Sequence, residues 1–566
     1  MAETLISAGV LARENDQSFI TQGPVTVGAA IIGPTAKGPV EIPTVVTSYS
    51  EYQNKFGSTI TSGSNVYSYF TSIAAYNYFQ NGGETLLVSR VVNGAYTPAV
   101  TTLDGEENAV SVTFKTIGEG ILMNSSSSVN ADGSMDSGSA DNVRWEVLNS
   151  NSGSGTFDLL VRRGNDTTND KSVLETWTNL SLDPFSSNYV AKRIGDQTST
   201  YTADGTSYYL QTSGAYPNAS RYIRVSAVNA TTPNYLDNSG VAKSAYTASI
   251  PVAQSGGFIS ATGDVKDAAK FYDEITSTDT QGLVGTDYTN MINLLSNSDD
   301  YKFNVLITPG LYDADYTTQL TSIISNTQNR GDNLFILDPV KHGATVTAVT
   351  SQAASRNTSY AASYWPWVQV IDPDTGRQVW VPASTLMAGV FAYNDSVSEP
   401  WFAPAGINRG GLGQVVRPER KLAQATRDAL YTNKVNPIAS FPGTGVVVYG
   451  QKTLQTKSTA LDRVNVRRLL IAMKSYIAGV AQNLVFEQNS AATRNNFLAQ
   501  VNPYLEGIQQ KQGLYAFKVV MDETNNTADV IDRNELIGQI YVQPTKTAEY
   551  IYLDFNVTPT GVAFPA

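Results

Sequence analysis

Few residues of this 566-residue chain have the types and spacing that catalysis requires. The chain has no cysteine and a single histidine, so disulfides, thiolate chemistry and a zinc site with several Cys or His ligands are excluded. A catalytic triad could use only His342 as its base, and no nucleophile elbow lies near it. We interpret His342 as a loop residue without a catalytic role. The alternative is that the protein is a hydrolase that uses His342 as its base.

Glycine-rich and acidic segments are the candidates for phosphate and metal binding. Gly33–Gly38 and Asn408–Gly413 lack both the P-loop spacing and the dinucleotide-binding spacing. Asp372–Gly376 starts like a calcium loop but lacks the remaining ligands, so it predicts a hairpin turn. The acidic pairs Asp299-Asp300 and Asp522-Glu523 lie in polar turns. We therefore expect no enzyme activity, no cofactor and no metal site.

Charge and hydropathy limit the partners. The net charge of −12 argues against nucleic-acid binding. No apolar run reaches the roughly 18 residues needed to span a bilayer, and the first twelve residues carry Glu3 and no basic leader, so we expect no membrane insertion, no signal peptide and synthesis in a cytoplasm. Residues 417–474 are an exception, with eleven Lys and Arg against three acids. This basic region is either a solvated helix face or a docking surface for an acidic partner.

The elements that position these residues indicate a mixed α/β protein with an inserted β region. Apolar runs at 303–310 and 334–339 flank a helical stretch at 316–328, which predicts a βαβ unit. Residues 21–96 also contain a helical stretch followed by an apolar run that predicts a buried strand, which is typical of α/β structure. Between 97 and 240, short alternating runs separated by Gly, Ser, Asn and Asp predict an antiparallel β-barrel or sandwich.

Beyond residue 351 we expect a further domain. The turn at Asp372–Gly376 predicts a hairpin. Apolar residues recur at helical spacing over 466–484, and a second helical stretch over 490–512 contains Pro503, which we expect to kink or split it. Alternation over Tyr550–Val557 predicts a final strand.

The chain is too long for one core, so several domains are expected. The predicted division is an N-terminal arm at 1–20, a middle α/β domain at 21–96 plus 241–350, an inserted β domain at 97–240, a C-terminal α/β domain at 351–545, and a C-terminal arm at 546–566. The first twenty residues look extended and unable to bury themselves, and the last strand is followed by a Pro/Gly tail. Both ends are either flexible tails or linking arms. Each could add a strand to a neighbouring subunit's sheet, and such head-to-tail contacts propagate into rings or helical filaments.

Several blocks, taken in order, resemble a known family. They include Gly9–Glu14 (with Ala8 where proline is usual), Ile31–Pro39, Pro43–Tyr49, Phe56-Gly57, Trp401–Gly410, Phe486-Glu487, Asn489–Phe497 and Ala548–Phe555. The chain resembles the sheath protein of contractile phage tails and of related contractile injection systems. The 97–240 region matches only loosely, as a lobe that varies within the family would.

The resemblance implies a structural role without nucleotide or catalysis. It implies a virion subunit, made in the host cytoplasm, that stacks in helical rings around a tail tube. After a baseplate trigger the sheath contracts and drives the tube through the host envelope for genome ejection. The implied partners are further copies of the chain, the tube, the baseplate and the tail terminator. A surface-layer or capsid-associated lattice subunit is the structural alternative.

The resemblance also assigns roles to residues. The C-terminal domain would line the inside of the sheath, with the middle and inserted domains further out. The arms would link subunits through Gly9, Val10, Glu14, Tyr550, Ile551, Tyr552, Leu553 and Phe555. From the basic region we hypothesise a tube-facing patch of Arg463, Arg467, Arg468 and Lys474.

Overall fold

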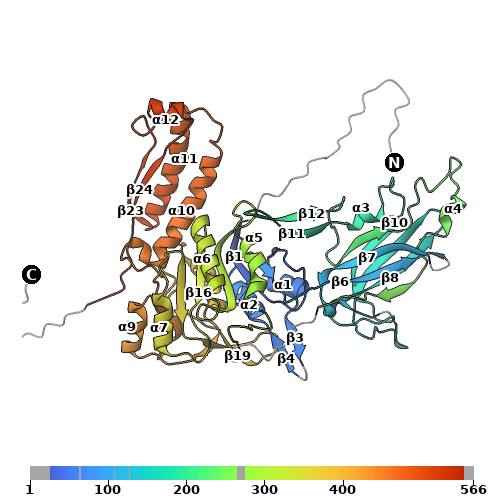
Figure 1. Cartoon of the computed structure of the whole chain (residues 1–566), viewed down its shortest axis with the longest axis horizontal. Coiled ribbons are helices and arrows are strands. Elements are labelled where there is room, and N and C mark those ends of the chain that lie inside the picture. Colours follow the sequence, from blue (N-terminus) through green and yellow to red (C-terminus); the bar gives the residue numbers. More distant parts are fainter. Residues whose placement is uncertain (1–25, 63–64, 107–108, 127, 264–274, 553–566) are drawn as a thin grey trace, which may run out of the picture.

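The computed structural model describes residues 26–62, 65–106, 109–126, 128–263 and 275–552. Figure 1 shows three parts: an α/β body, a β-rich lobe on one side of it, and a narrow projection that carries two long helices. Each part has a hydrophobic core of its own. The chain is therefore a mixed α/β multidomain protein, as predicted.

The body is built on an eight-stranded sheet in the order β2-β5-β1-β15-β16-β17-β21-β22. All neighbouring strands are parallel except at the two edges, where β2 and β22 run antiparallel. The strands are β1 (Thr26–Gly33), β2 (Thr44–Val46), β5 (Leu86–Arg90), β15 (Lys302–Tyr312), β16 (Leu334–Asp338), β17 (Ala361–Trp365), β21 (Val435–Phe441) and β22 (Gly445–Val448). The predicted βαβ unit is confirmed, because α6 connects the parallel strands β15 and β16.

Helices cover both faces of this sheet (Figure 1). Helices α2 and α8 pack together and contact β15, while α6 contacts β15 and β16. The helices of the body are α1 (Tyr49–Phe56), α2 (Phe70–Gln80), α5 (Thr289–Leu294), α6 (Thr317–Arg330), α7 (Val346–Ala354), α8 (Ser384–Val397) and α9 (Gln424–Thr432). Two small sheets complete the body: β3 (Thr59–Ser62) with β4 (Asn65–Ser68), and β18 (Val368–Ile371) with β19 (Gln378–Val381) and β20 (Val415–Pro418).

The sheet of the body continues across the domain boundary predicted at residue 351. Strands β17, β21 and β22 lie beyond it yet belong to the same sheet as β15 and β16. The core of the body likewise runs from Ala29 to Ile471. The hairpin at 372–376 exists, since β18 and β19 are antiparallel, but it is an appendage of the body. Strands β16 and β17 pair through hydrogen bonds, and the hydrophobic pattern within each segment cannot predict which strand will be its neighbour.

The lobe consists of two antiparallel sheets that share one core. One has the order β10-β9-β8-β14 and the other the order β13-β7-β6, and Phe114, Trp145 and Phe157 are buried between them. Its strands are β6 (Pro98–Asp104), β7 (Val110–Glu119), β8 (Val143–Asn151), β9 (Thr156–Arg163), β10 (Val173–Ser181), β13 (Ile223–Val228) and β14 (Ser255–Gly257). Short helices α3 (Val190–Ile194) and α4 (Ser244–Thr247) belong to it.

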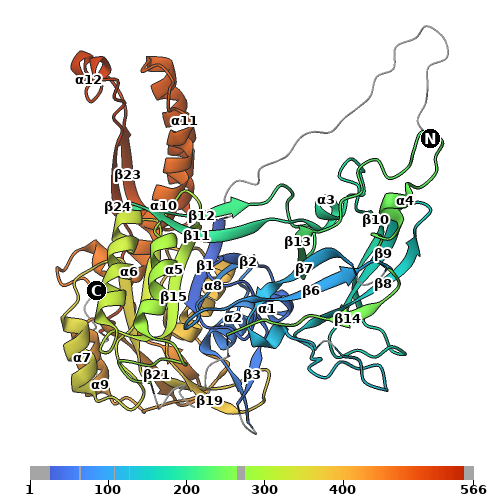
Figure 2. The same cartoon turned by 45° about the vertical axis from the view of Figure 1, so that its right-hand side comes forward.

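The lobe extends past its predicted end at residue 240. Strand β14 pairs with β8, and Ile259 bridges Val100. The two connections meet at a neck, where the Thr97 amide donates to the Thr262 carbonyl at 3.1 Å. A hairpin of β11 (Thr198–Asp204) and β12 (Ser207–Ser213) reaches from the lobe to α5 (Figure 2).

The projection is formed by two helices and a hairpin. They are α10 (Val464–Gln482), α11 (Ala491–Gln510), β23 (Leu514–Val520) and β24 (Gln539–Pro544), with α12 (Ala528–Asp532) between the strands. Val501 and Leu505 lie in its core. Helix α11 runs unbroken through Pro503, so the predicted split is not observed. Over the described ranges, no helix combines the length and apolar character that crossing a bilayer requires.

Candidate assembly surfaces

The structure buries two residues of the predicted tube-facing patch. Arg467 and Arg468 are 4% and 6% exposed. The Arg467 guanidinium lies over Tyr360, 4.0 Å from the ring centroid, and burial lowers its pKa. The Arg468 guanidinium lies over Phe391 and pairs with Asp395. These two side chains make their contacts inside the subunit and leave little surface for a tube.

The other two residues of that patch are more accessible. Lys474 is exposed on the same side of α10 as Arg467, and its Nζ donates to the Tyr360 hydroxyl at 3.2 Å. Arg463 is half-buried at the N-terminus of α10, where it pairs with Asp462 at 2.9 Å. Lys421 and Lys457 of the basic region are also exposed. The basic region therefore exposes positive charge at Lys421, Lys457 and Lys474, but Arg467 and Arg468 do not contribute to that exposed charge.

Arg463 also binds Glu549, the residue just before the predicted linking strand. Its Nε and a terminal nitrogen donate to the two carboxylate oxygens at 2.6 and 2.9 Å. The Tyr431 hydroxyl donates to the same carboxylate at 2.9 Å and the Gln451 amide at 3.1 Å. Burial acts to raise the pKa of Glu549, but the hydrogen bonds from Arg463, Tyr431 and Gln451 lower it overall. The carboxylate is thus held in its charged form.

The chain becomes exposed directly after Glu549. Tyr550, Ile551 and Tyr552 are 65%, 76% and 86% exposed, and none of them is in a strand. Large apolar side chains in water are typical of a segment that binds another chain. The remaining predicted linking residues lie outside the described residues: Gly9, Val10, Glu14, Leu553 and Phe555.

Sequence reasoning missed the second strand of the projection's hairpin. Strands β23 and β24 form a two-stranded antiparallel sheet, so within the described part of the chain each has one unpaired edge. Tyr515 and Tyr541 are 63% and 57% exposed on it. The alternation of Ile540 and Val542 with polar neighbours was the available signal. An open edge of this kind is a template for strand addition.

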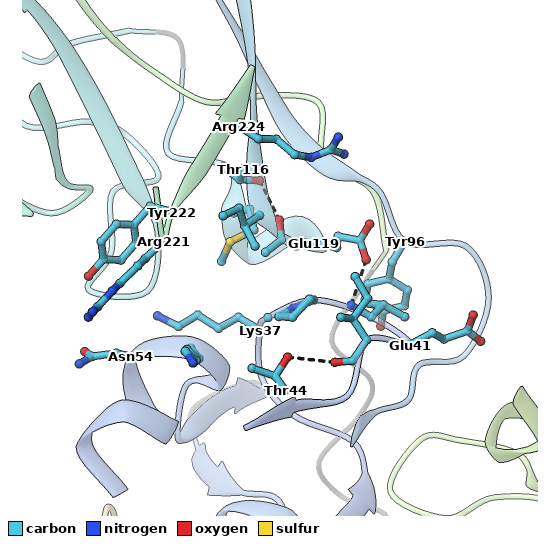
Figure 3. A pocket seen from close by; sticks show the side chains of 18 of the residues that line it. Lys37, Glu41, Thr44, Asn54, Tyr96, Thr116, Glu119, Arg221, Tyr222 and Arg224 are labelled. Carbon is cyan, nitrogen blue, oxygen red and sulfur yellow. Dashed lines mark hydrogen bonds between the residues drawn. The ribbon is translucent and has the colours of Figure 1, made fainter. Parts of the chain in front are cut away.

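A cleft of about 1430 Å³ separates the body from the lobe. Lys37 and Asn54 line its body side, and Arg221, Tyr222 and Arg224 line its lobe side (Figure 3). The cleft is lined by groups of both charges, Lys37 and Arg224 among the cations and Glu41 and Glu119 among the anions.

Direct contacts join the body to the lobe at this cleft. Lys37 pairs with Asp141 at 3.0 Å, and the Val40 amide donates to Glu119 at 3.2 Å. Burial raises the pKa of Glu119. These contacts place the junction between two cores beside the neck.

The other residues considered for catalysis or metal binding, His342 and the turn at Asp372–Gly376, are held by packing and hydrogen bonds within the subunit. The His342 ring lies 5.5 Å from Trp367 and 5.2 Å from Trp380, between centroids, as a packed side chain does. Asp374 of the turn accepts hydrogen bonds from Tyr49 at 2.5 Å and Gln53 at 2.8 Å, which fastens the turn to α1. Among the described residues, no group of three or more Asp, Glu or His is arranged to hold a metal ion.

Comparison with known families gives consecutive matches over the second half of the chain. The family described as "Phage tail sheath protein central domain" matches residues 281–454, and "Phage tail sheath C-terminal domain" matches residues 456–558. These matches contain β15 to β22, the projection and the Glu549 site. The junction between them falls just before α10, where the body gives way to the projection.

Individual relatives agree. The tail sheath protein of Vibrio phage KVP40 is 43% identical over 208 residues, which cover 37% of this chain and 31% of that protein. The tail sheath protein of Salmonella phage ViI is 31% identical over 323 residues, covering 53% and 51%. The chain therefore spans about a third to about a half of these relatives' lengths. A sheath tail protein from Listeria innocua shares the fold, with a TM-score of 0.53 at 10% identity over 92% of this chain and 96% of that one. Residues 281–454 and 456–558, just under half of the chain, are therefore similar to phage tail sheath proteins.

Proposed function

We propose that this chain is the structural subunit of a contractile tail sheath. Copies of it polymerise helically around a tail tube and contract to drive the tube through the host envelope for genome ejection. The observation that carries this proposal is the pair of consecutive sheath-domain matches over 281–558. The subunit acts in the virion, without enzyme activity or nucleotide, and is made in the host cytoplasm.

The exposed strand edges and the terminal arms give a route to polymerisation. In this proposal, residues after Glu549 add to an edge of β23 or β24 in one neighbour, and the segment around Gly9, Val10 and Glu14 does so in another. The open edges of β23 and β24 and the exposed Tyr550–Tyr552 support this. Since donor and acceptor surfaces differ, the contacts are heterologous and propagate into a helix.

The separate cores give a route to contraction. Body, lobe and projection each have a core of their own, so each can move as a rigid part while the contacts between them change. We propose that the projection and the adjoining surface of the body face the tube, with Lys474 among the contacts. The lobe, as a β-sandwich, lies further out. The baseplate and tail terminator are the expected partners at the two ends of the sheath.

Negative-stain electron microscopy of the concentrated protein tests the proposal. The full chain should form hollow tubes, and a variant that lacks residues 1–20 should not. Circular dichroism establishes that the shortened chain is folded, and His342→Ala serves as the matched full-length control that should form tubes normally.

Other outcomes separate the alternatives. Flat lattices in place of tubes would favour a surface-layer or capsid-associated subunit. Monodisperse particles from both chains would contradict the sheath proposal. Hydrolytic activity that His342→Ala abolishes would favour the enzyme alternative.

A further inference from the structure

The segment that follows β24 crosses from the projection to the body. At the end of β24 the Thr545 hydroxyl donates to the Gln512 carbonyl at 2.7 Å, and its amide donates to the Gly513 carbonyl at 3.2 Å. Four residues later, Glu549 is held by groups at the base of the projection and on the body. Residues 545–549 therefore span the junction between two cores.

The Glu549 site is assembled from three separate segments. Tyr431 comes from α9, Gln451 follows β22, and Arg463 is the N-cap residue of α10. Gln451 also donates to the Thr547 hydroxyl at 2.5 Å, so two residues of the arm are held. The Glu549 and Arg463 side chains are only 17% and 24% exposed. Charge-assisted, two-point hydrogen bonding of this kind is strong and directional.

A second set of contacts holds the site itself in place. The Lys452 ammonium lies 4.4 Å from the Tyr431 ring centroid and donates to the Tyr431 carbonyl at 2.8 Å. Asp462 holds the other side of Arg463 at 2.9 Å. Donors that are already fixed lose little freedom when they bind a carboxylate, which favours a rigid site.

We infer that Glu549 is an ionic clasp that fixes the point from which the C-terminal arm departs. Without the clasp, the arm would swing from Thr545 at the end of β24. With it, the arm starts at the body, beside α9, and the linking residues Tyr550–Tyr552 follow directly. This inference rests on the proposed function for its purpose: a fixed departure point lets movement of the body pull directly on a neighbouring subunit.

Distance measurement between two spin labels tests the clasp. Because the chain has no cysteine, Tyr552→Cys and Lys421→Cys create the only labelling sites. Both positions are exposed. In dilute, unassembled protein the otherwise unchanged chain should give a narrow distance distribution. Glu549→Gln, which removes the charge, should broaden it, and Glu549→Asp, which keeps the charge, should restore part of the narrow peak.

The chain offers a matched control. Glu535 pairs with Arg533 at 3.0 Å in the projection, but both side chains are about half-exposed. Glu535→Gln should leave the distribution unchanged. A thermal melt establishes that each variant is folded.

The outcomes separate the clasp from the proposed function. An identical narrow distribution in Glu549→Gln would overturn the clasp, even if the protein forms tubes. A broadened distribution in a protein that never forms tubes would support the clasp and contradict the sheath proposal. If the otherwise unchanged chain is already broad, Glu549 does not hold the arm and the inference fails.

Discussion

Arg467 of α10 stacks on Tyr360, which lies just before β17, and this contact joins the projection to the body. Lys474, two turns further along α10, reaches the hydroxyl of the same tyrosine. The Tyr360 side chain thus contacts both a buried cation, Arg467, and an exposed one, Lys474. The pair shows that the charge of the basic region is divided between holding the subunit together and facing its surroundings.

Arg467→Ala should therefore destabilise the subunit. Loss of a desolvated cation–π contact and of the packed side-chain stem should lower the free energy of unfolding by about 2–3 kcal/mol. Chemical denaturation followed by tryptophan fluorescence measures this. Lys474→Ala, on the same ring but exposed, should change stability by less than about 0.5 kcal/mol. Equal effects of the two changes would contradict the division described above.

Asp166→Ala should destabilise the lobe selectively. Asp166 accepts two hydrogen bonds from Arg162 at 2.8 and 2.9 Å and pairs with Arg144 at 3.3 Å. Both arginines are fully buried, and removing the carboxylate leaves Arg144 without its ion pair and Arg162 with Glu146 alone, at a cost of about 3–5 kcal/mol. Calorimetry should show an earlier lobe transition with the body transition unchanged. Asp170→Ala, an exposed position in the same loop, should not shift either one.

Asp338 should make stability depend on pH in an unusual direction. It lies at the carboxyl end of β16 and accepts hydrogen bonds from the Ser384 amide at 3.1 Å and hydroxyl at 2.5 Å. Burial raises its pKa to about 7, despite these hydrogen bonds. The unfolded carboxyl ionises near pH 3.8, so between about pH 4 and pH 7 the folded state binds the extra proton. Its contribution to stability is therefore full below about pH 4 and is lost as the pH rises to 7.

Asp338→Asn should remove this dependence. Relative to the unchanged chain, the variant should gain stability as the pH rises from 4 to 7, by at most about 4 kcal/mol at about 1.4 kcal/mol per unit. Urea unfolding at several pH values gives the difference. Asp299→Asn, at an exposed turn, is the control. A difference that does not change with pH would show that Asp338 stays ionised.

Pro503→Ala should stabilise the projection. Pro503 lies inside α11, is exposed, and has no amide hydrogen for the helical ladder. Alanine would restore that hydrogen bond and should raise the free energy of unfolding by about 1–3 kcal/mol. Thermal melts followed by circular dichroism measure the change. Ala499→Gly, one turn earlier, should lower stability by about 1 kcal/mol.

The sequence predicts the local elements well and their long-range pairing poorly. Leu334–Leu337 is recognisable as a strand because burial on both faces requires an unbroken apolar run. That β17 would extend the same sheet depends on hydrogen bonds between segments with no shared local pattern. The burial of Arg467 and Arg468 was missed for a related reason. Helical spacing identifies one apolar face of α10, but Tyr360 and Phe391 come from elsewhere to cover its cations.

The Glu549 site was only partly predictable. Arg463 stands out within a basic region, and Glu549 lies in a block that resembles the family. Nothing in the sequence says that these two residues meet, because 85 residues and a whole projection separate them along the chain. Tyr431 and Gln451 carry no local signal at all, since each is an ordinary polar residue until the fold brings it to the carboxylate.

The neck at Thr97 and Thr262 makes the lobe a replaceable part. The two threonine hydroxyls are 2.9 Å apart, so the chain enters and leaves the lobe at almost the same point. The entropy of closing a loop rises only slowly with its length, so the closure cost depends little on the length of the segment between these ends. A receptor-binding module, an enzyme or a short linker could take the lobe's place there, which offers evolution a site for exchange and protein engineers an attachment port.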